Sequence, residues 1–169
     1  MKIKMILLVA LFAIGSVSFG QQKSSNDNWN WIMGKWIGEG SGQPGQGGGT
    51  FSFSYDLDKN IIVRKSHSEY PATANKPAII HEDLMIIDLD PNGNASKAIY
   101  FDNENHTIHY QISYSDKTIT LTSEKIENAP VFRLVYTLLD NETVNTKFEM
   151  SRDGINFSTY IEGKSKKMK

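Results

Sequence analysis

The sequence contains no cysteine among its 169 residues, which excludes disulfide bonds, thiolate catalysis and lipid attachment to a cysteine. Without disulfides, a domain of this size must be held together by core burial. Proline is also scarce, at five residues. The apolar run from Met5 to Ile14 is about half the length that a membrane-spanning helix needs. We therefore expect no membrane span in the mature protein.

The first twenty residues have the three parts of an export signal. Lys2 and Lys4 precede the apolar run, and the small residues Ser18 and Gly20 follow it. This pattern predicts a signal peptide over residues 1–20, cleaved near Gly20, then a flexible polar leader over 21–28 and one domain over 29–169. The protein is expected to be periplasmic or secreted, and an exported chain without cysteine favours a bacterial periplasm.

The charge balance argues against one class of partner. The formal net charge is −1 at pH 7, and it becomes more negative when Lys2 and Lys4 leave with the signal peptide. A nucleic-acid-binding domain neutralises phosphates with clustered Lys and Arg. We therefore expect no nucleic-acid partner.

Alternation of apolar and polar residues predicts an all-β domain. Thr50–Leu57 and His106–Tyr114 carry aromatic or aliphatic residues at every second position. A turn at 115–117 joins the latter segment to the alternating segment 118–122, which predicts a hairpin. No helical pattern longer than a turn or two follows Trp29–Gly34. Further strands are predicted at Lys35–Ser41, Asn60–His67, Ile79–Leu89, Lys97–Phe101, Val131–Leu139, Val144–Ser151 and Ile155–Gly163.

The strand number and the short turns favour an antiparallel up-and-down barrel of about ten strands with a short N-terminal helical turn. Closure into a barrel removes exposed strand edges, although an open sandwich would show the same alternation. The glycine-rich segment 38–49 lacks a Gly-Lys-Ser/Thr ending and leads into a strand. We interpret it, like residues 71–77, as a loop at a barrel rim rather than a phosphate-binding loop.

The first predicted strand carries a recognisable motif. Gly34-x-Trp36, directly after the helical turn, resembles the start of lipocalins and their calycin relatives. The resemblance implies a buried indole that closes one end of the barrel. It also implies a basic side chain from the last strand over that indole, for which Arg152, Lys164 and Lys166 are the candidates.

The C-terminal part carries a second resemblance. Arg133-x-x-Tyr136 and the segment Phe148–Phe157, which contains Asp153-Gly154, look like the closing strands of a bacterial lipocalin-like family of unknown function. Gly34 and Trp36 are expected to have structural roles at a strand start, and Asp153 and Gly154 in a turn. Such a resemblance implies the fold and leaves the activity open.

Residues Trp36–Gly40 also resemble nitrobindin-type haem barrels, in which a histidine late in the barrel ligates the iron. The four histidines here are His67, His81, His106 and His109, and none lies in the last sixty residues. Haem is therefore disfavoured, and the cofactor remains unknown.

No catalytic or metal-binding constellation is predicted. His106 and His109 are three residues apart, so a strand would place them on opposite faces. The cluster His81-Glu82-Asp83 is typical of a solvated edge, although His81 and Asp83 share a face. A Gly-x-Ser-x-Gly elbow is absent.

Aromatic residues at alternating positions provide the best candidates for ligand contacts. Some must fill the core, but a barrel of this size can enclose a ligand that aromatic rings cover and Tyr hydroxyls orient. We hypothesise an exported binding protein that holds a small, largely apolar molecule. A haem- or cofactor-dependent barrel and a structural or interaction module of the cell envelope are the alternatives. The predicted ligand-binding residues are Phe53, Tyr55, Tyr110, Tyr114, Tyr136 and Phe148.

Overall fold

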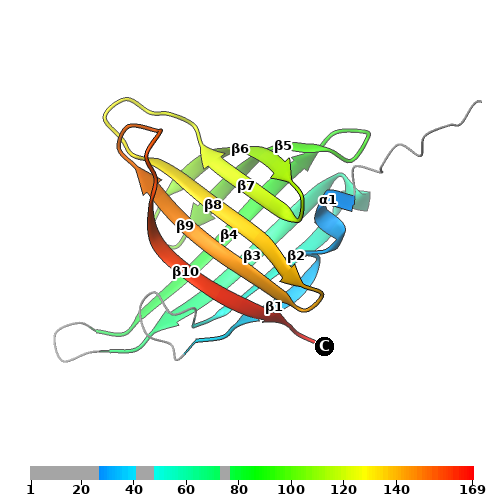
Figure 1. The fold of residues 1–169 in the computed structure, drawn as a ribbon, viewed down its shortest axis with the longest axis horizontal. Coiled ribbons are helices and arrows are strands. Elements are labelled where there is room, and N and C mark those ends of the chain that lie inside the picture. Colours follow the sequence, from blue (N-terminus) through cyan, green and yellow to red (C-terminus); the bar gives the residue numbers. More distant parts are fainter. Residues whose placement is uncertain (1–26, 41–47, 73–76) are drawn as a thin grey trace, which may run out of the picture.

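The protein forms a closed barrel of ten antiparallel strands in a computed structural model that describes residues 27–40, 48–72 and 77–169 (Figure 1). Each strand pairs with its neighbours in sequence, and β1 pairs with β10 to close the barrel. The predicted all-β, up-and-down barrel is therefore confirmed. The strands are β1 (Gly34–Gly38), β2 (Thr50–Asp56), β3 (Ile61–Tyr70), β4 (Ile79–Leu89), β5 (Ala95–Asp102), β6 (Thr107–Ser115), β7 (Thr118–Ser123), β8 (Val131–Asp140), β9 (Thr143–Ser151) and β10 (Ser158–Lys167).

Several predictions fall on residues that the structure does not describe. The predicted signal peptide and most of the predicted leader lie outside the described residues, and so do parts of the two predicted rim loops at 38–49 and 71–77.

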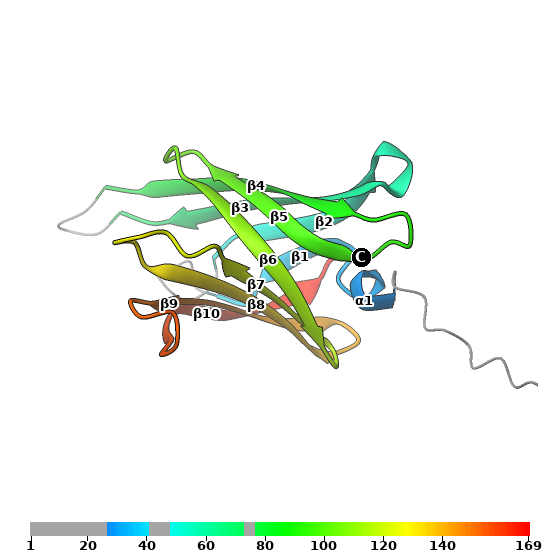
Figure 2. The same ribbon diagram turned by 90° about the horizontal axis from the view of Figure 1, so that it is seen from above.

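The two ends of the barrel differ. The short helix α1 (Asp27–Asn30) lies at one end, which we call the α1 end (Figures 1 and 2). The opposite end, where β3 finishes at Tyr70 and β6 begins at Thr107, is called the distal end. Strands β3–β5 and β8–β10 form opposite walls between these ends (Figure 2). A side chain that points inward from one wall therefore faces the other wall.

Strand β10 corrects the predicted C-terminal boundary. The last strand is predicted over Ile155–Gly163, but it runs from Ser158 to Lys167 and so includes most of the lysine-rich tail, residues 164–169. Its start is delayed because the Asp153 side chain accepts hydrogen bonds from the Ile155 and Asn156 amides at 2.8 Å, which fixes a turn instead. The tail is needed to close the barrel against β1.

Trp36 is fully buried, and its indole nitrogen donates a hydrogen bond to the Ile32 carbonyl at 2.8 Å. The cation over the indole is Lys167, whose Nζ lies 5.3 Å from the ring centroid. None of the three predicted cations, Arg152, Lys164 and Lys166, has this role. Trp36 and Lys167 are register partners and share the inner face. Lys164 and Lys166 are three residues and one residue before Lys167, and both spacings are odd, so these two side chains lie on the outer face.

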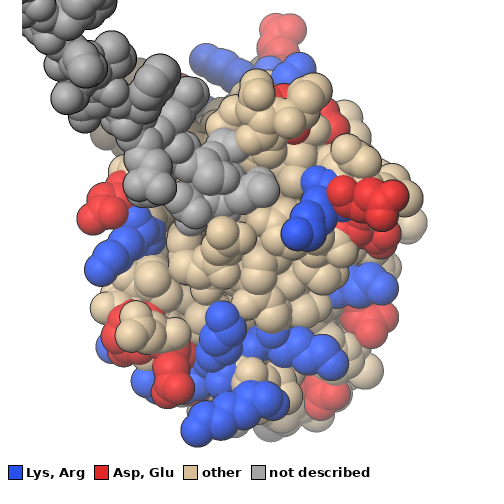
Figure 3. Space-filling model, turned by 90° about the vertical axis from the view of Figure 1, so that its right-hand side faces the viewer, with Lys and Arg blue, Asp and Glu red and all other residues tan. Residues whose placement is uncertain are grey.

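Basic side chains gather on the lower part of the face that the α1 end presents in Figure 3. The β1–β10 pairing explains part of this grouping. It places Ile37 opposite Lys166 and Trp36 opposite Lys167, and the Met168 amide donates to the Lys35 carbonyl at 2.8 Å. The C-terminal lysines are therefore part of an ordered, paired strand.

The core fills the α1 half of the barrel. Trp29 of α1 packs on Phe53, with ring centroids 5.9 Å apart, and its indole nitrogen donates to the Tyr114 hydroxyl at 2.7 Å. Close packing of this kind leaves little room for another molecule. The other fully buried side chains include Ile32, Ile62, Met85, Ile87, Ile119, Leu121 and Val144.

Candidate functional site

The inner surface changes character along the barrel axis. Toward the distal end, the inward positions of β3–β5 carry polar side chains, whereas those of β6 and β8–β10 carry mainly apolar ones. Most of these residues are half-buried, in contrast to the fully buried core of the α1 half. The distal half therefore presents a polar wall opposite an apolar wall. Its inward residues are Arg64, Ser66, His81, Asp83, Tyr100 and Asp102 on the polar wall, and Ile108, Phe132, Phe148 and Ile161 on the apolar wall.

A buried ion pair forms the centre of the polar wall. Arg64 of β3 donates a hydrogen bond to Asp83 of β4, and 8% and 7% of the two side chains are exposed. The guanidinium carbon also lies 5.9 Å from the ring centroids of Phe51 and Tyr136. Burial works against the charge of Arg64, but Tyr136 and Asp83 raise its pKa above the usual value, so the guanidinium stays charged.

A group of hydrogen-bonded side chains adjoins this ion pair on its distal side, where His81 Nε2 lies 3.8 Å from an Asp83 carboxylate oxygen. The His81 ring nitrogens lie 3.0 Å from the Tyr100 hydroxyl and 3.2 Å from a Glu104 carboxylate oxygen. The Tyr100 hydroxyl donates to Asp102 at 3.2 Å, and Nδ1 of His106 lies 2.8 Å from the same carboxylate. Burial and the nearby acidic groups raise the pKa of Tyr100, which keeps its hydroxyl protonated.

Three buried polar atoms stand out because they lack a hydrogen-bond partner among the described residues: Arg64 Nε, the Tyr136 hydroxyl and Thr146 Oγ1. Tyr136 of β8 and Thr146 of β9 are register partners, so their side chains share the inner face. Burial raises the pKa of Tyr136 to about 12, and the Arg64 charge opposes this rise. Buried polar atoms are normally paired, so these three are candidates to bind a polar group.

The apolar wall is built from aromatic contacts. Phe132 of β8 and Phe148 of β9 stack with ring centroids 5.7 Å apart, and Tyr160 of β10 meets Phe148 edge-on at 6.3 Å. Ile161 is the register partner of Phe148 and therefore shares its inward face. This wall offers apolar surface opposite the hydrogen-bonding groups of β3–β5.

The six predicted ligand-binding residues all belong to, or pack against, the core. Phe53, Tyr55 and Tyr114 lie in the α1 half, and the Tyr55 hydroxyl donates to Asn30 of the helix at 3.3 Å. Tyr110 and Tyr136 are buried in the core, and Phe148 belongs to the apolar wall. Their role in binding a ligand stays a prediction, but only the latter three border the distal half.

The sequence interpretation missed the ion pair. Alternation alone does not identify Arg64 as a site residue, and it places Asp83 in a solvated edge, whereas the Asp83 side chain is buried. A signal was present, because Ile62 and Arg64 share a face of β3, and Asp83 shares a face with Met85 and Ile87. The contact between Arg64 and Asp83 depends on the register of β3 against β4. Arg64 pairs with Met85, and Asp83 is two residues before Met85 on the same face of β4.

Of the four histidines, His81 is the one at an inward strand position. His67 and His109 lie on outward positions of β3 and β6, and His106 precedes β6 with its side chain 61% exposed. His81 points inward, but both its ring nitrogens already have partners. Within the described ranges, no group of three or more His, Asp or Glu side chains is placed to hold a metal ion.

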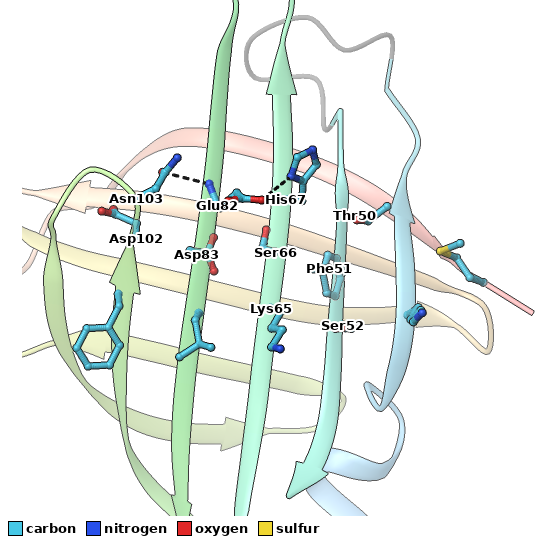
Figure 4. Close-up of a pocket in the computed structure, with 14 residues that line it drawn as sticks. Thr50, Phe51, Ser52, Lys65, Ser66, His67, Glu82, Asp83, Asp102 and Asn103 are labelled. Carbon is cyan, nitrogen blue, oxygen red and sulfur yellow. Dashed lines mark hydrogen bonds and ion pairs between the residues drawn. The ribbon is translucent and has the colours of Figure 1, made fainter.

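A separate hollow of about 640 Å³ lies across strands β1–β5 (Figure 4). Most of the residues that line it, such as Lys65, His67 and Glu82, are at outward strand positions, so the hollow lies on the outer face of the barrel. The inward residues Ser66, Asp83 and Asp102 border it from the same strands. Figure 4 shows the contacts of Glu82: its carboxylate lies 3.2 Å from Nδ1 of His67, and its backbone amide donates a hydrogen bond to the Asn103 side-chain oxygen at 3.2 Å.

In the described part of the chain, no helix is both long and apolar enough to cross a membrane. The chain matches no protein-family model, and a comparison with curated proteins finds no match.

Proposed function

We propose that this protein binds a small, largely apolar molecule in the distal half of its barrel. The observation that carries the proposal is the contrast between the two halves. The α1 half is filled by Trp29, Trp36 and other fully buried side chains, whereas the inward residues of the apolar wall in the distal half are only half-buried. This contrast supports a binding place between the polar wall and the apolar wall.

The apolar wall supplies the main favourable contribution. Covering Ile108, Phe132, Phe148 and Ile161 with an apolar molecule removes their remaining exposed surface from water, which contributes roughly 25 cal/mol per Å². Aromatic walls with a few convergent polar groups are typical of small-molecule sites. Export to the periplasm or medium, as expected from residues 1–20, is part of the same proposal.

A second candidate function is supported by the outer hollow. Its lining combines the apolar side chains of Leu84 and Phe101 with the basic side chains of Lys35 and Lys65. In this alternative the protein is an interaction module of the cell envelope and acts through its outside. Filling the inside of the barrel would then leave its function unchanged.

The test uses N-phenyl-1-naphthylamine, an uncharged apolar fluorophore, as the probe. We expect saturable fluorescence enhancement with one probe per protein and a Kd on the order of 10 μM. Ile108→Trp adds an indole to the inner face of the distal half and is expected to weaken binding at least about tenfold.

Ile99→Trp is the matched control, because Ile99 lies on the outer face of β5, one residue from the register partner of Ile108. The control is expected to bind the probe like the unsubstituted protein. Absence of probe binding, or equal binding by both variants, would contradict the proposal and favour the interaction module.

A further inference from the structure

If the barrel binds an apolar molecule as proposed, the three unpartnered polar atoms indicate which chemical group that molecule carries. Arg64 Nε is a donor only, whereas the hydroxyls of Tyr136 and Thr146 can each donate or accept. All three can therefore donate to one kind of group, an acceptor oxygen. Leaving such buried donors unpaired is unfavourable, so a ligand oxygen that accepts hydrogen bonds from them gains more binding free energy than it would at the protein surface.

The three residues are neighbours although they come from opposite walls. The Arg64 guanidinium carbon lies 5.9 Å from the Tyr136 ring centroid, which links β3 to β8 across the interior. Thr146 is the register partner of Tyr136 on the same inner face. Tyr136 is fully buried and 6% of Arg64 is exposed, so the group is shielded from bulk water.

The charges around these donors indicate whether the ligand oxygen that they bind is anionic or neutral. Arg64 already pairs with Asp83, so its positive charge is offset. Asp102, with 3% of its side chain exposed, adds a second carboxylate to the same wall, partnered by His106. A ligand carboxylate would therefore meet Asp83 at close range without a free cation, and like charges in a shielded site repel strongly.

We infer that the protein selects a molecule with an apolar chain and a neutral oxygen head group, a ketone or an alcohol, and that Asp83 discriminates against the corresponding carboxylate. The head group lies among Arg64, Tyr136 and Thr146. The chain extends along Phe132, Phe148 and Ile161 toward the distal end.

The experiment is displacement of N-phenyl-1-naphthylamine at neutral pH by 2-dodecanone, 1-dodecanol and dodecanoate, which share a chain length and differ in head group. We expect the ketone and the alcohol to displace the probe at concentrations at least about tenfold lower than the carboxylate. Equal or stronger displacement by dodecanoate would overturn the inference.

Asp83→Asn tests the source of the selectivity. Asparagine keeps a carbonyl that can accept from Arg64 but removes the negative charge, so the affinity for dodecanoate is expected to rise at least about tenfold. Glu82→Gln is the matched control, because it removes a negative charge from the neighbouring residue on the outer face. An unchanged preference in Asp83→Asn would overturn the role of Asp83.

Tyr136→Phe tests the head-group site without disturbing the ion pair. Its hydroxyl donates to no described group and interacts only with the Arg64 guanidinium, so its loss is expected to change the stability of the free protein little while the affinity for 2-dodecanone falls about tenfold. Tyr114→Phe is the matched control, because that hydroxyl accepts from Trp29 and donates to the Ala95 carbonyl at 2.9 Å. It is expected to lower stability and leave selectivity unchanged.

The outcomes separate the two proposals. If the probe binds but the ketone, the alcohol and the carboxylate displace it equally, the head-group inference is wrong and the binding function stands. If the probe does not bind at all, both are wrong. If Tyr136→Phe leaves ketone affinity unchanged, the three atoms are not the head-group site.

Discussion

Arg64 and Asp83 form an ion pair in the interior of the barrel, between adjacent strands, with 8% and 7% of their side chains exposed. A pair of this kind contributes little net stability compared with apolar residues of similar size, because both charges lose their hydration. Its retention in the interior is therefore better explained by function than by stability. In our account, Asp83 holds the guanidinium and sets the charge that a ligand meets.

Removing one partner of this pair is expected to be costly. Asp83→Ala leaves a buried, uncompensated guanidinium and is predicted to lower the free energy of unfolding by about 3 to 5 kcal/mol. Urea denaturation measures this change. Glu162→Ala is the control, because its 3.7 Å ion pair with Lys147 is exposed and should contribute less than about 1 kcal/mol. Equal losses in the two variants would show that Arg64 is not effectively buried.

Lys167 is predicted to stabilise the barrel closure through its contact with Trp36. Lys167→Gln removes the cation that lies 5.3 Å from the ring centroid and is expected to lower the unfolding free energy by about 0.5 to 1 kcal/mol. Lys164→Gln, at an exposed position of the same strand, is expected to have no measurable effect. Thermal unfolding compares them, and equal stabilities would count against the contact.

Two glycines are predicted to differ in their tolerance of alanine. At Gly49, with a φ of +134°, an added Cβ would lie 2.2 Å from the His67 carbonyl oxygen, so Gly49→Ala should cost about 3 kcal/mol. At Gly154, with a φ of +78°, the nearest atom would be 3.6 Å away on Val131, so Gly154→Ala should cost about 1 kcal/mol. Chemical denaturation ranks the two, and the reverse order would contradict the prediction.

The Asp153 turn is predicted to make stability depend on pH. Hydrogen bonds from the Asn156 and Ile155 amides and from Ser151 hold the pKa of Asp153 below its usual value. A carboxylate whose pKa is lower in the folded state stabilises the protein above its unfolded pKa of about 3.9. This contribution is lost as the pH falls below that value toward the folded pKa.

Asp153→Asn is therefore expected to lower the melting temperature at neutral pH, with the difference from the unsubstituted protein narrowing as the pH falls below about 4. Asp116→Asn, in the turn before β7, is the control, because it removes the same charge at a residue that lacks the hydrogen-bond donors around Asp153. A difference for Asp153→Asn that is constant over this pH range would contradict the prediction.

The sequence was sufficient for the architecture because alternation reports directly which residues face inward. It located all ten strands, and the bounds of β4 agree with those predicted. It failed at the C-terminus, because a lysine-rich segment has the composition of a solvated tail. Only the pairing of β10 with β1 shows that Ser165 is buried and that Lys167 lies on the face of Trp36.

The candidate site was less accessible to sequence analysis. Phe148 and Tyr136 were predicted as inward residues, because alternation identifies aromatic residues well. Arg64 and Asp83 were missed because charged residues are mostly exposed, and their burial depends on the register between β3 and β4. The unpartnered Tyr136 hydroxyl could be recognised only once its surroundings were known.

The most direct test of the central claim is to map bound N-phenyl-1-naphthylamine on the protein by backbone amide chemical shifts. The account predicts that shifts concentrate on the distal parts of β3–β6 and β8–β10, including Ile108, Phe132 and Ile161. Shifts confined to the outer hollow, around Lys65 and Phe101, would contradict it and assign binding to the outside of the barrel.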